Sequence, residues 1–247
     1  MKRKNLIYSL FALILLGVLW NEGPGLRWEP EGLYINKNFR DVGASLNSCL
    51  TDSRQSPIFK DKLYLRSNKW FSGWSCDAVE NPETIVTLNY QPDRKRTYFC
   101  WDGFDQVVGK FAPSNTEISD IEFYETWFNE AQRKPICANL EAILNSLNEK
   151  KRTLIHCDAG RDRTGAFSGI IAALATESAF GKIPTNIMNA IECDYQKSHS
   201  LKKDKYGRLE KFFGDVYSKH NSIAAFIYNR CNISVASVNE SAHSFLK

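Results

Sequence analysis

Several features are missing from the 247-residue sequence, and each absence narrows the class of protein. No CxxC pair occurs among the seven cysteines, so nothing supports a zinc ribbon or a thioredoxin motif. No internal repeat is present. Apolar residues make up 43% of the chain and charged residues 24%, close to the averages of globular proteins. Collagen-like, disordered and multispan membrane proteins are therefore excluded.

The body of the chain also lacks an excess of charge of one sign. The formal net charge of +4 comes mostly from the three cations at positions 2–4. Without residues 1–20, 29 Lys and Arg stand against 28 Asp and Glu. The bulk charge therefore gives no case for a nucleic-acid partner.

One long apolar run is present, and it lies at the N-terminus. The cations precede the run Leu6–Trp20, a pattern typical of a secretory signal. As a helix this run would span only about 22 Å of a hydrocarbon core of roughly 30 Å. No A-x-A-like cleavage site follows, so we expect residues 1–22 to be an uncleaved signal anchor, with a cleaved signal peptide as the main alternative. The leading cations favour a cytoplasmic N-terminus, which predicts a membrane-anchored or exported domain outside the cytoplasm, periplasmic or extracellular.

The rest of the chain divides by composition. Residues 23–31 are rich in Gly, Pro and charge, which indicates a linker. Residues 32–218 have the size of one α/β domain, and residues 219–247 are a weakly patterned C-terminal extension.

Periodicity predicts an α/β domain with a central, mostly parallel sheet flanked by helices. Short β-rich runs bounded by turn residues predict strands at Leu33–Asn36, Leu63–Arg66, Thr84–Tyr90, Arg96–Trp101 and Thr153–Cys157. Helical patterns predict helices at Ile118–Arg133, Ala138–Lys150, Thr164–Ser178, Pro184–Lys197 and Arg208–Ser218.

The segment Thr153–Gly165 joins a β-rich run, a tight polar loop and an apolar helix. In such a loop successive backbone N–H groups converge on one point, and the positive end of the helix dipole adds to them. Gly160 supplies the conformational freedom for the turn. The order of elements therefore predicts a binding site for a phosphate dianion.

Two side chains of this segment suit phosphoryl chemistry. Cys157 stands at the end of the predicted strand, where the N–H groups and the helix terminus would favour a nucleophilic thiolate. Arg163 can offer a planar, bidentate fork to two phosphoryl oxygens and neutralise charge in the transition state.

The segment resembles the signature of the cysteine-based protein tyrosine phosphatase superfamily, H-C-x5-R-[ST]. The matching residues are His156, Cys157, Arg163 and Thr164. Three further segments resemble the dual-specificity-like branch of bacterial and fungal tyrosine and phosphoinositide phosphatases: residues 38–43 (NFRDVG), residues 63–67 (LYLRS) and residues 194–198 (DYQKS).

The resemblance implies a phosphoric monoester hydrolase that works through a cysteinyl-phosphate, without a metal or another cofactor. Cys157 would attack phosphorus, and Thr164 would stabilise the departing thiolate by a hydroxyl hydrogen bond. His156 is expected to order the loop rather than to transfer protons. The phosphate-binding residues implied are Cys157, Asp158, Ala159, Gly160, Arg161, Asp162 and Arg163. Arg66 and Asp41 have family counterparts near this loop, although a purely structural role explains them as well.

The general acid has three candidates. In most of the superfamily an Asp on a loop after a strand protonates the leaving oxygen, and Asp102 occupies that position. In the nearer relatives the role belongs to an Asp just before the Arg of the loop, which matches Asp162, and Asp105 is the third choice.

The substrate class rests on the charges of the loop. A phosphotyrosine protein is the leading expectation, and Arg161 keeps an inositol or lipid phosphate as the alternative. Asp158 counts against that alternative because it places an anion in the same loop. A further hypothesis is a catalytically silent module that only binds phosphate. The N-terminal segment would supply a membrane contact.

The cysteine count is odd. Setting one reactive thiol aside leaves six cysteines, which could pair in any of 15 ways in an exported protein. The favoured reading is that most of them are small buried hydrophobic residues.

Overall fold

The computed structural model describes residues 38–50, 57–88, 98–104, 106–109, 113 and 118–247. The N-terminal segment, the linker and the strand expected at Leu33–Asn36 lie outside these residues. Within them, no helix has both the length and the apolar character needed to cross a membrane.

The described residues form a mostly parallel sheet with helices packed on it, as the sequence predicts. The strands are β1 (Arg40–Asp41), β2 (Tyr64–Ser67), β3 (Thr84–Thr87), β4 (Cys100–Trp101), β5 (Val107–Val108) and β6 (Thr153–His156). The α-helices are α2 (Val42–Cys49), α3 (Glu130–Asn148), α4 (Asp162–Phe180), α5 (Thr185–Gln196), α6 (Arg208–His220), α7 (Ile223–Cys231) and α8 (Val235–His243). Short 3-10 turns are η1 (Lys69–Phe71), η2 (Cys76–Val79), η4 (Tyr124–Phe128) and η5 (Lys203–Lys205).

The main sheet has the order β1-β2-β6-β3. Strands β2 and β3 both run parallel to β6, and β1 is antiparallel to β2. The carboxyl ends of three strands therefore meet at one edge of the sheet, where open α/β sheets bind their ligands. Strands β4 and β5 form a separate antiparallel hairpin.

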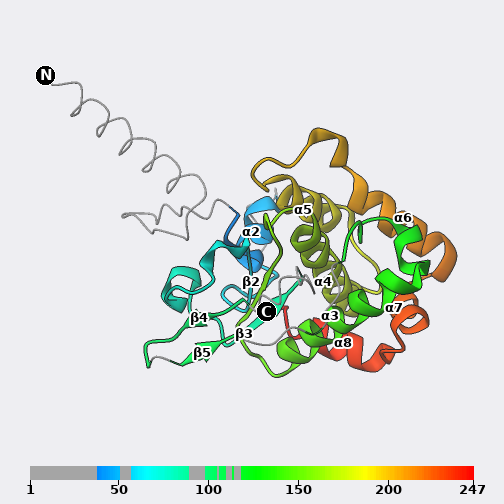
Figure 1. Cartoon of the computed structure of the whole chain (residues 1–247). Coiled ribbons are helices and arrows are strands. Elements are labelled where there is room, and N and C mark those ends of the chain that lie inside the picture. Colours follow the sequence, from blue (N-terminus) through cyan, green and yellow to red (C-terminus); the bar gives the residue numbers. More distant parts are fainter. Residues whose placement is uncertain (1–37, 51–56, 89–97, 105, 110–112, 114–117) are drawn as a thin grey trace, which may run out of the picture.

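The two faces of the sheet carry cores of unequal size. Helices α3 to α8 gather on one side of the molecule, and the β4–β5 hairpin lies on the other (Figure 1). Alternate strand residues face the two sides: Val86 and Ile155 join the large helical core, whereas Ile85 and Leu154 join a small core. The small core consists of Leu65, Phe71, Cys76, Val79, Ile85, Tyr98, Cys100 and Leu154.

The helical core forms around α4. Almost every residue of α4 from Thr164 to Glu177 is buried, because other helices surround it. Residues 219–247, which look weakly patterned in the sequence, form α7 and α8, and α8 packs closely against α4 and α3. Serine hydroxyls cap both short helices: Ser222 accepts from the N–H of Ala225 at 3.0 Å, and Ser234 from that of Ser237 at 3.1 Å.

The prediction of a helix at Ile118–Arg133 is wrong for the first part of that range. Asp120 has a positive φ of 51°, which breaks a helix, and Tyr124–Phe128 forms a 3-10 turn. Helix α3 begins only at Glu130, after the Asn129 side chain accepts a hydrogen bond from the N–H of Ala131 at 3.0 Å. It then runs through the helix expected at Ala138–Lys150.

All seven cysteines lie in the described part of the chain, and six of them pair. The disulfides are Cys49–Cys193, Cys76–Cys100 and Cys137–Cys231. Cys157 is the free thiol. Of the two readings left open by the cysteine count, the structure supports the disulfide framework.

Candidate active site

Residues 157–163, here called the phosphate loop, connect the end of β6 to the start of α4. Cys157 follows the last residue of β6 and is 2% exposed. Its Sγ accepts a hydrogen bond from the backbone N–H of Gly160 at 3.2 Å. The loop therefore curls back over the sulfur atom.

Four successive carbonyl groups of the phosphate loop are held by partners outside the ring of the loop. The Asp158 carbonyl accepts from the backbone N–H of Lys69 at 3.2 Å, and the Ala159 carbonyl from the Asn38 amide at 2.7 Å. The Arg66 guanidinium donates to the carbonyls of Gly160 and Arg161, at 2.9 and 3.0 Å. Because these carbonyls are engaged from outside the loop, the backbone N–H groups of the loop are the groups available to an anion, as in other anion sites built from successive N–H groups.

Gly160 is required by both its backbone and its surroundings. Its φ is +67°, a region that favours glycine. A Cβ at this position would lie 2.7 Å from the backbone carbonyl of Ser67, which cannot move aside as a flexible side chain could. The turn therefore depends on the absence of a side chain.

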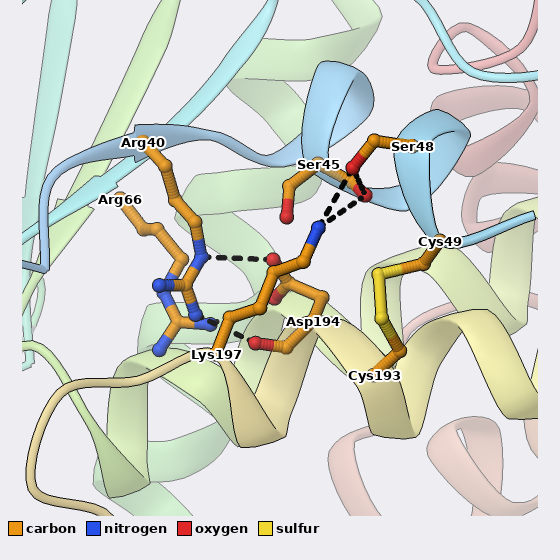
Figure 2. Close-up of a disulfide and its surroundings, with 8 residues drawn as sticks. All are labelled: Arg40, Ser45, Ser48, Cys49, Arg66, Cys193, Asp194 and Lys197. Carbon is orange, nitrogen blue, oxygen red and sulfur yellow. Dashed lines mark hydrogen bonds and ion pairs between the residues drawn. A yellow bond between two sulfur atoms is a disulfide. The ribbon is translucent and has the colours of Figure 1, made fainter.

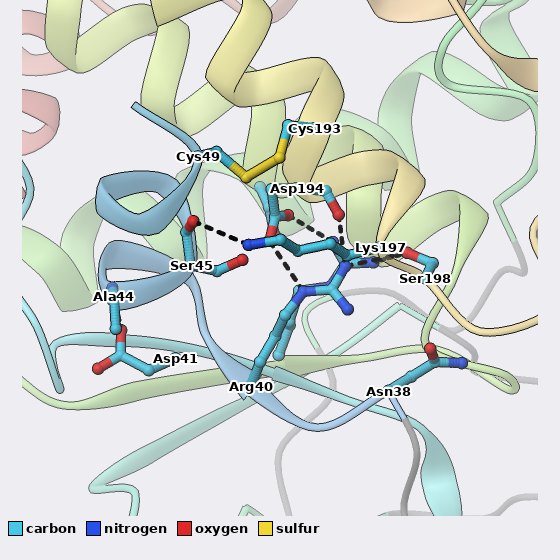
Figure 3. Close-up of polar contacts among 12 residues, drawn as sticks. Asn38, Arg40, Asp41, Ala44, Ser45, Cys49, Cys193, Asp194, Lys197 and Ser198 are labelled. Atoms are coloured by element: carbon cyan, nitrogen blue, oxygen red, sulfur yellow. Dashed lines mark hydrogen bonds and ion pairs between the residues drawn. A yellow bond between two sulfur atoms is a disulfide. The ribbon is translucent and has the colours of Figure 1, made fainter. Parts of the chain in front are cut away.

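A buried group of polar side chains, here called the arginine network, supports the loop from the interior of the protein. It consists of Arg40, Arg66, Asp194 and Ser198. Arg66 is 0% exposed and donates to the Asp194 carboxylate at 2.8 Å and to Ser198 Oγ at 3.0 Å. Arg40 donates to the other carboxylate oxygen of Asp194 at 2.8 Å (Figure 3). One carboxylate thus orients both guanidinium groups.

The charge of Asp194 is stabilised despite its burial. Removal from water opposes ionisation, but the positive charges of Arg40 and Arg66 hold the pKa of this carboxyl below its usual range. Burial lowers the pKa of Arg40 to about 10, and the neighbouring Arg66 adds to that effect. At neutral pH the arginine network therefore contains two cations and one anion.

The three sequence segments of the family resemblance converge on the arginine network and the loop above it. Asn38 and Arg40 belong to the first segment, Arg66 to the second, and Asp194 and Ser198 to the third. Asp41 does not reach the loop: its carboxylate accepts from the N–H of Ala44 at 3.1 Å and caps α2. The acidic partner of Arg66 is Asp194.

The outer rim of the loop carries paired charges, here called the rim pairs. Asp158 forms an ion pair with Lys69, and Asp162, in the first turn of α4, forms one with Lys205. Arg161 donates to the carbonyl of Ser200 at 3.2 Å, and its Nε lies 3.7 Å from the Asp162 carboxylate. These side chains are partly exposed, so the rim faces solvent.

Arg163 is the last residue of the phosphate loop, and Thr164 follows it in α4. The Arg163 guanidinium is half-buried and donates to the carbonyl of Leu88, just beyond β3, at 3.4 Å. The Thr164 hydroxyl is buried and makes no hydrogen bond with any of the described residues.

His156 is enclosed in the small core. Its Nδ1 lies 3.4 Å from the Cys157 carbonyl and its Nε2 lies 2.9 Å from Thr87 Oγ1, so Nδ1–H donates and Nε2 accepts. The rings of Phe71 and Tyr98 pack edge-on against the imidazole. Burial lowers the pKa of His156 to about 3, so the ring is neutral at pH 7 and holds the end of β6.

Asp102 lies in the turn of the β4–β5 hairpin. Its Oδ1 accepts from the backbone N–H groups of Phe104 and Gln106, both at 2.8 Å. These bonds close its own turn and do not connect it to the phosphate loop. Asp105 lies outside the described residues. The structure therefore brings Cys157 to Thr164 together in one loop and leaves Asp102 in a separate element.

The comparison with protein families agrees with this site. A model of the tyrosine phosphatase family matches residues 110–247, more than half of the chain. The chain belongs to the tyrosine phosphatase family. As a member it is a phosphoric monoester hydrolase, and the matched region includes the phosphate loop and Asp194 but not Asn38, Arg40 or Arg66. No curated protein matches the chain.

Sequence reasoning did not place several residues in the site of this phosphatase. Asn38, Arg40 and Asp194 belong to the resembling segments but have no role assigned from the sequence. Lys69 carries no signal of its own, and Lys205 belongs to a basic run that is typical of a solvated surface. A buried Arg–Asp pair is hard to find because its members are 128 residues apart in the chain. Among the described residues, no group of three or more His, Cys, Asp or Glu side chains is placed to hold a metal ion.

Proposed function

We propose that this phosphatase hydrolyses phosphotyrosine in proteins, with Cys157 as nucleophile and the N–H groups of the phosphate loop as the anion site. The observation that carries the proposal is the outward orientation of four successive loop carbonyls around the free Cys157 thiol. Cys157 attacks phosphorus, the alcohol or phenol leaves, and water then hydrolyses the cysteinyl-phosphate.

Arg163 and Thr164 are assigned to the two ends of this reaction. Arg163 is fixed at the base of α4, where its fork would contact two equatorial oxygens of the transferring group. The buried Thr164 hydroxyl, which makes no hydrogen bond to the described residues, is available to donate to the departing thiolate in the second step.

Asp162 is the proposed general acid. It precedes Arg163 in the loop, and its side chain is 28% exposed to solvent. The Asp102 carboxylate is engaged by two N–H groups of its own turn and Asp162 by Lys205, but only Asp162 belongs to the loop that carries Cys157. An Asp162→Asn variant should lose the basic limb of the pH–rate profile, whereas Asp102→Asn should keep it. The opposite result would assign the acid to Asp102.

The charges on the rim favour a singly phosphorylated substrate. Each carboxylate of the rim has a cationic partner, and Arg161 lies near Asp162. A second phosphate would have to displace these contacts. Exposed aromatic side chains also occur on η1, after it and on the β4–β5 hairpin: Trp70, Trp74, Trp101 and Phe104. The centre of the Trp70 ring lies 5.7 Å from Lys69 Nζ. Such side chains suit a peptide better than a bare inositol ring.

An oxidising compartment is the proposed location. Disulfides persist in secreted and periplasmic proteins and are rare in the cytosol. Three of them in one domain, together with the basic and apolar N-terminal segment, support a domain exported or anchored outside the cytoplasm.

The test is phosphate release by the full chain in detergent, with Cys157→Ser as the blank. Four substrate classes are compared: a phosphotyrosine peptide, a phosphoserine peptide, phosphoinositide in mixed micelles and an inositol polyphosphate. We expect Cys157-dependent release to be fastest with the phosphotyrosine peptide. A preference for either inositol substrate would replace the proposed substrate class, and no Cys157-dependent release from any of them would mean that the loop only binds phosphate.

A further inference from the structure

The disulfide Cys49–Cys193 lies directly beside the arginine network. Cys49 is the last residue of α2, and Cys193 is the α5 residue that precedes Asp194. Their Cα atoms are 6.0 Å apart, and the bond joins the end of α2 to the last turn of α5 (Figure 2).

The segment Arg40–Cys49 is attached to α5 and to the residues just after it at three points. At its start, Arg40 donates to the Asp194 carboxylate, to the Asp194 carbonyl and to Ser198 Oγ. At its end, the disulfide binds Cys193. Between them, Lys197 Nζ donates to Ser48 Oγ at 2.7 Å (Figure 2). The disulfide is the covalent member of this set.

Asp194 transmits this alignment to the phosphate loop. Its carboxylate fixes Arg66, and Arg66 in turn holds the carbonyls of Gly160 and Arg161 outward. A shift of α5 relative to α2 would move the carboxylate away from one or both guanidinium groups. The N–H groups that bind phosphate would then lose their common orientation.

We propose that the Cys49–Cys193 disulfide is a positioning element of the phosphate loop, so that full phosphatase activity requires this disulfide to be formed. The proposal rests on the proposed function of the loop. It makes the enzyme weakly active while reduced and fully active once the two thiols have been oxidised. In the reverse direction, a dithiol supplies two electrons and two protons, the S–S bond becomes two thiols, and the dithiol becomes a disulfide.

The disulfide Cys137–Cys231 provides a matched control. It joins α3 to the end of α7 and has no member beside the arginine network. It closes 94 residues of sequence, against 144 for Cys49–Cys193. Because the entropic effect of a cross-link grows only with the logarithm of loop length, removing either bond should lower the unfolding temperature by a similar amount.

The experiment compares Cys49→Ala/Cys193→Ala with Cys137→Ala/Cys231→Ala, both in the full chain in detergent and well below their unfolding temperatures. The readouts are kcat and KM on an aryl phosphate and the inhibition constant of inorganic phosphate. For the first variant we expect kcat/KM to fall about tenfold and inorganic phosphate to bind about tenfold more weakly. For the second, both constants should stay within about twofold of the wild type. Equal effects in the two variants, or unchanged constants in the first, would overturn the proposal.

Asp194→Asn tests whether the effect travels through Asp194. This substitution is introduced into the wild type and into each cysteine variant. It should lower kcat/KM much less in the variant that lacks Cys49–Cys193, because that variant has already lost the alignment. In the variant that lacks Cys137–Cys231, Asp194→Asn should lower kcat/KM by the same factor as in the wild type. Additivity in both backgrounds would contradict transmission through Asp194.

A failure of the proposed function would look different. It would show as a wild-type protein without Cys157-dependent phosphate release. The binding of inorganic phosphate by wild type and by the two cysteine variants, measured by calorimetry, would then still decide whether the disulfide positions the loop.

Discussion

The phosphate loop is bordered by two sets of charged residues that differ in burial and in what they hold. The arginine network below it is almost completely buried, and Arg66 binds backbone carbonyls of the loop itself. The rim pairs above it involve side chains that are between 22% and 52% exposed, and they bind one another. A buried ion has lost its hydrating water, so removing its partner leaves an uncompensated charge. When an exposed ion pair is broken, water hydrates both charges instead. The same kind of contact should therefore have very different effects below and above the loop.

Arg66→Met should produce the largest effect. The methionine fills the space, but Asp194 then loses one of its two cations in a buried position. The Gly160 carbonyl loses its donor, and the Arg161 carbonyl keeps only the N–H of Gly165. We expect the free energy of unfolding to fall by about 3–5 kcal/mol. We also expect kcat/KM to fall by about 100-fold, since a misplaced loop no longer presents its N–H groups. Urea unfolding and steady-state kinetics measure the two effects. A variant with wild-type kinetics would show that the arginine network does not position the loop.

Gly160→Ala should affect activity more than stability. The new Cβ would meet the backbone of Ser67 at 2.7 Å, in a residue whose φ is +67°. The expected loss of stability is about 1–3 kcal/mol, and phosphate binding should weaken because the loop has to open. Ala159→Gly, next to it, is the control for an altered loop sequence. A Gly160→Ala protein that still binds inorganic phosphate like the wild type would argue against the close contact between the loop and β2.

His156→Gln should change how stability depends on pH. The folded pKa is about 3 and the unfolded value is about 6.5, so between these pH values the unfolded chain binds more protons. Stability is complete above about pH 6.5 and falls as the pH drops toward 3, by at most about 1.4 kcal/mol per pH unit for this group. Urea unfolding of both proteins at pH 7, 6 and 5 isolates the contribution of His156. Parallel curves for wild type and variant would mean that the ring is not kept neutral.

Lys69→Met should have the smallest effect. It removes the side chain from a rim pair, while the backbone N–H of Lys69 still holds the Asp158 carbonyl. The expected change in the free energy of unfolding is about 0–1 kcal/mol, and kcat/KM on a small aryl phosphate should stay within about twofold. Unfolding and kinetics at low and high salt provide the check. A loss as large as that of Arg66→Met would erase the distinction between the rim pairs and the arginine network.

Much of the fold could be predicted where the signal is local. Short β-rich runs bounded by turn residues predict β2, β3 and β6, and helical patterns predict α4, α5 and α6. The prediction failed at Ile118–Arg133, where a positive φ at Asp120 and the cap at Asn129 delay the helix until Glu130. Helices α7 and α8 are nine residues each, too short for a clear period, and only their serine caps give a sequence signal.

The site shows the same division. The phosphate loop was predictable because its conformation depends on neighbouring residues: a strand end, Gly160 and the first turn of a helix. The partners of the loop were not predictable. Lys69 and Lys205 approach it from other elements, and their charges carry no positional signal in the sequence.

The sequence by itself determined where the candidate active site lies, because Cys157 to Thr164 are consecutive residues between a strand and a helix. Tertiary structure decided what holds that site in place. Arg40 and Asp194 are 154 residues apart in the chain, and their pairing follows from the packing of α2 against α5. The same packing selected Cys49–Cys193 among the 15 ways in which six cysteines could pair. Contacts between distant segments depend on which faces become buried together, and only the folded chain specifies that.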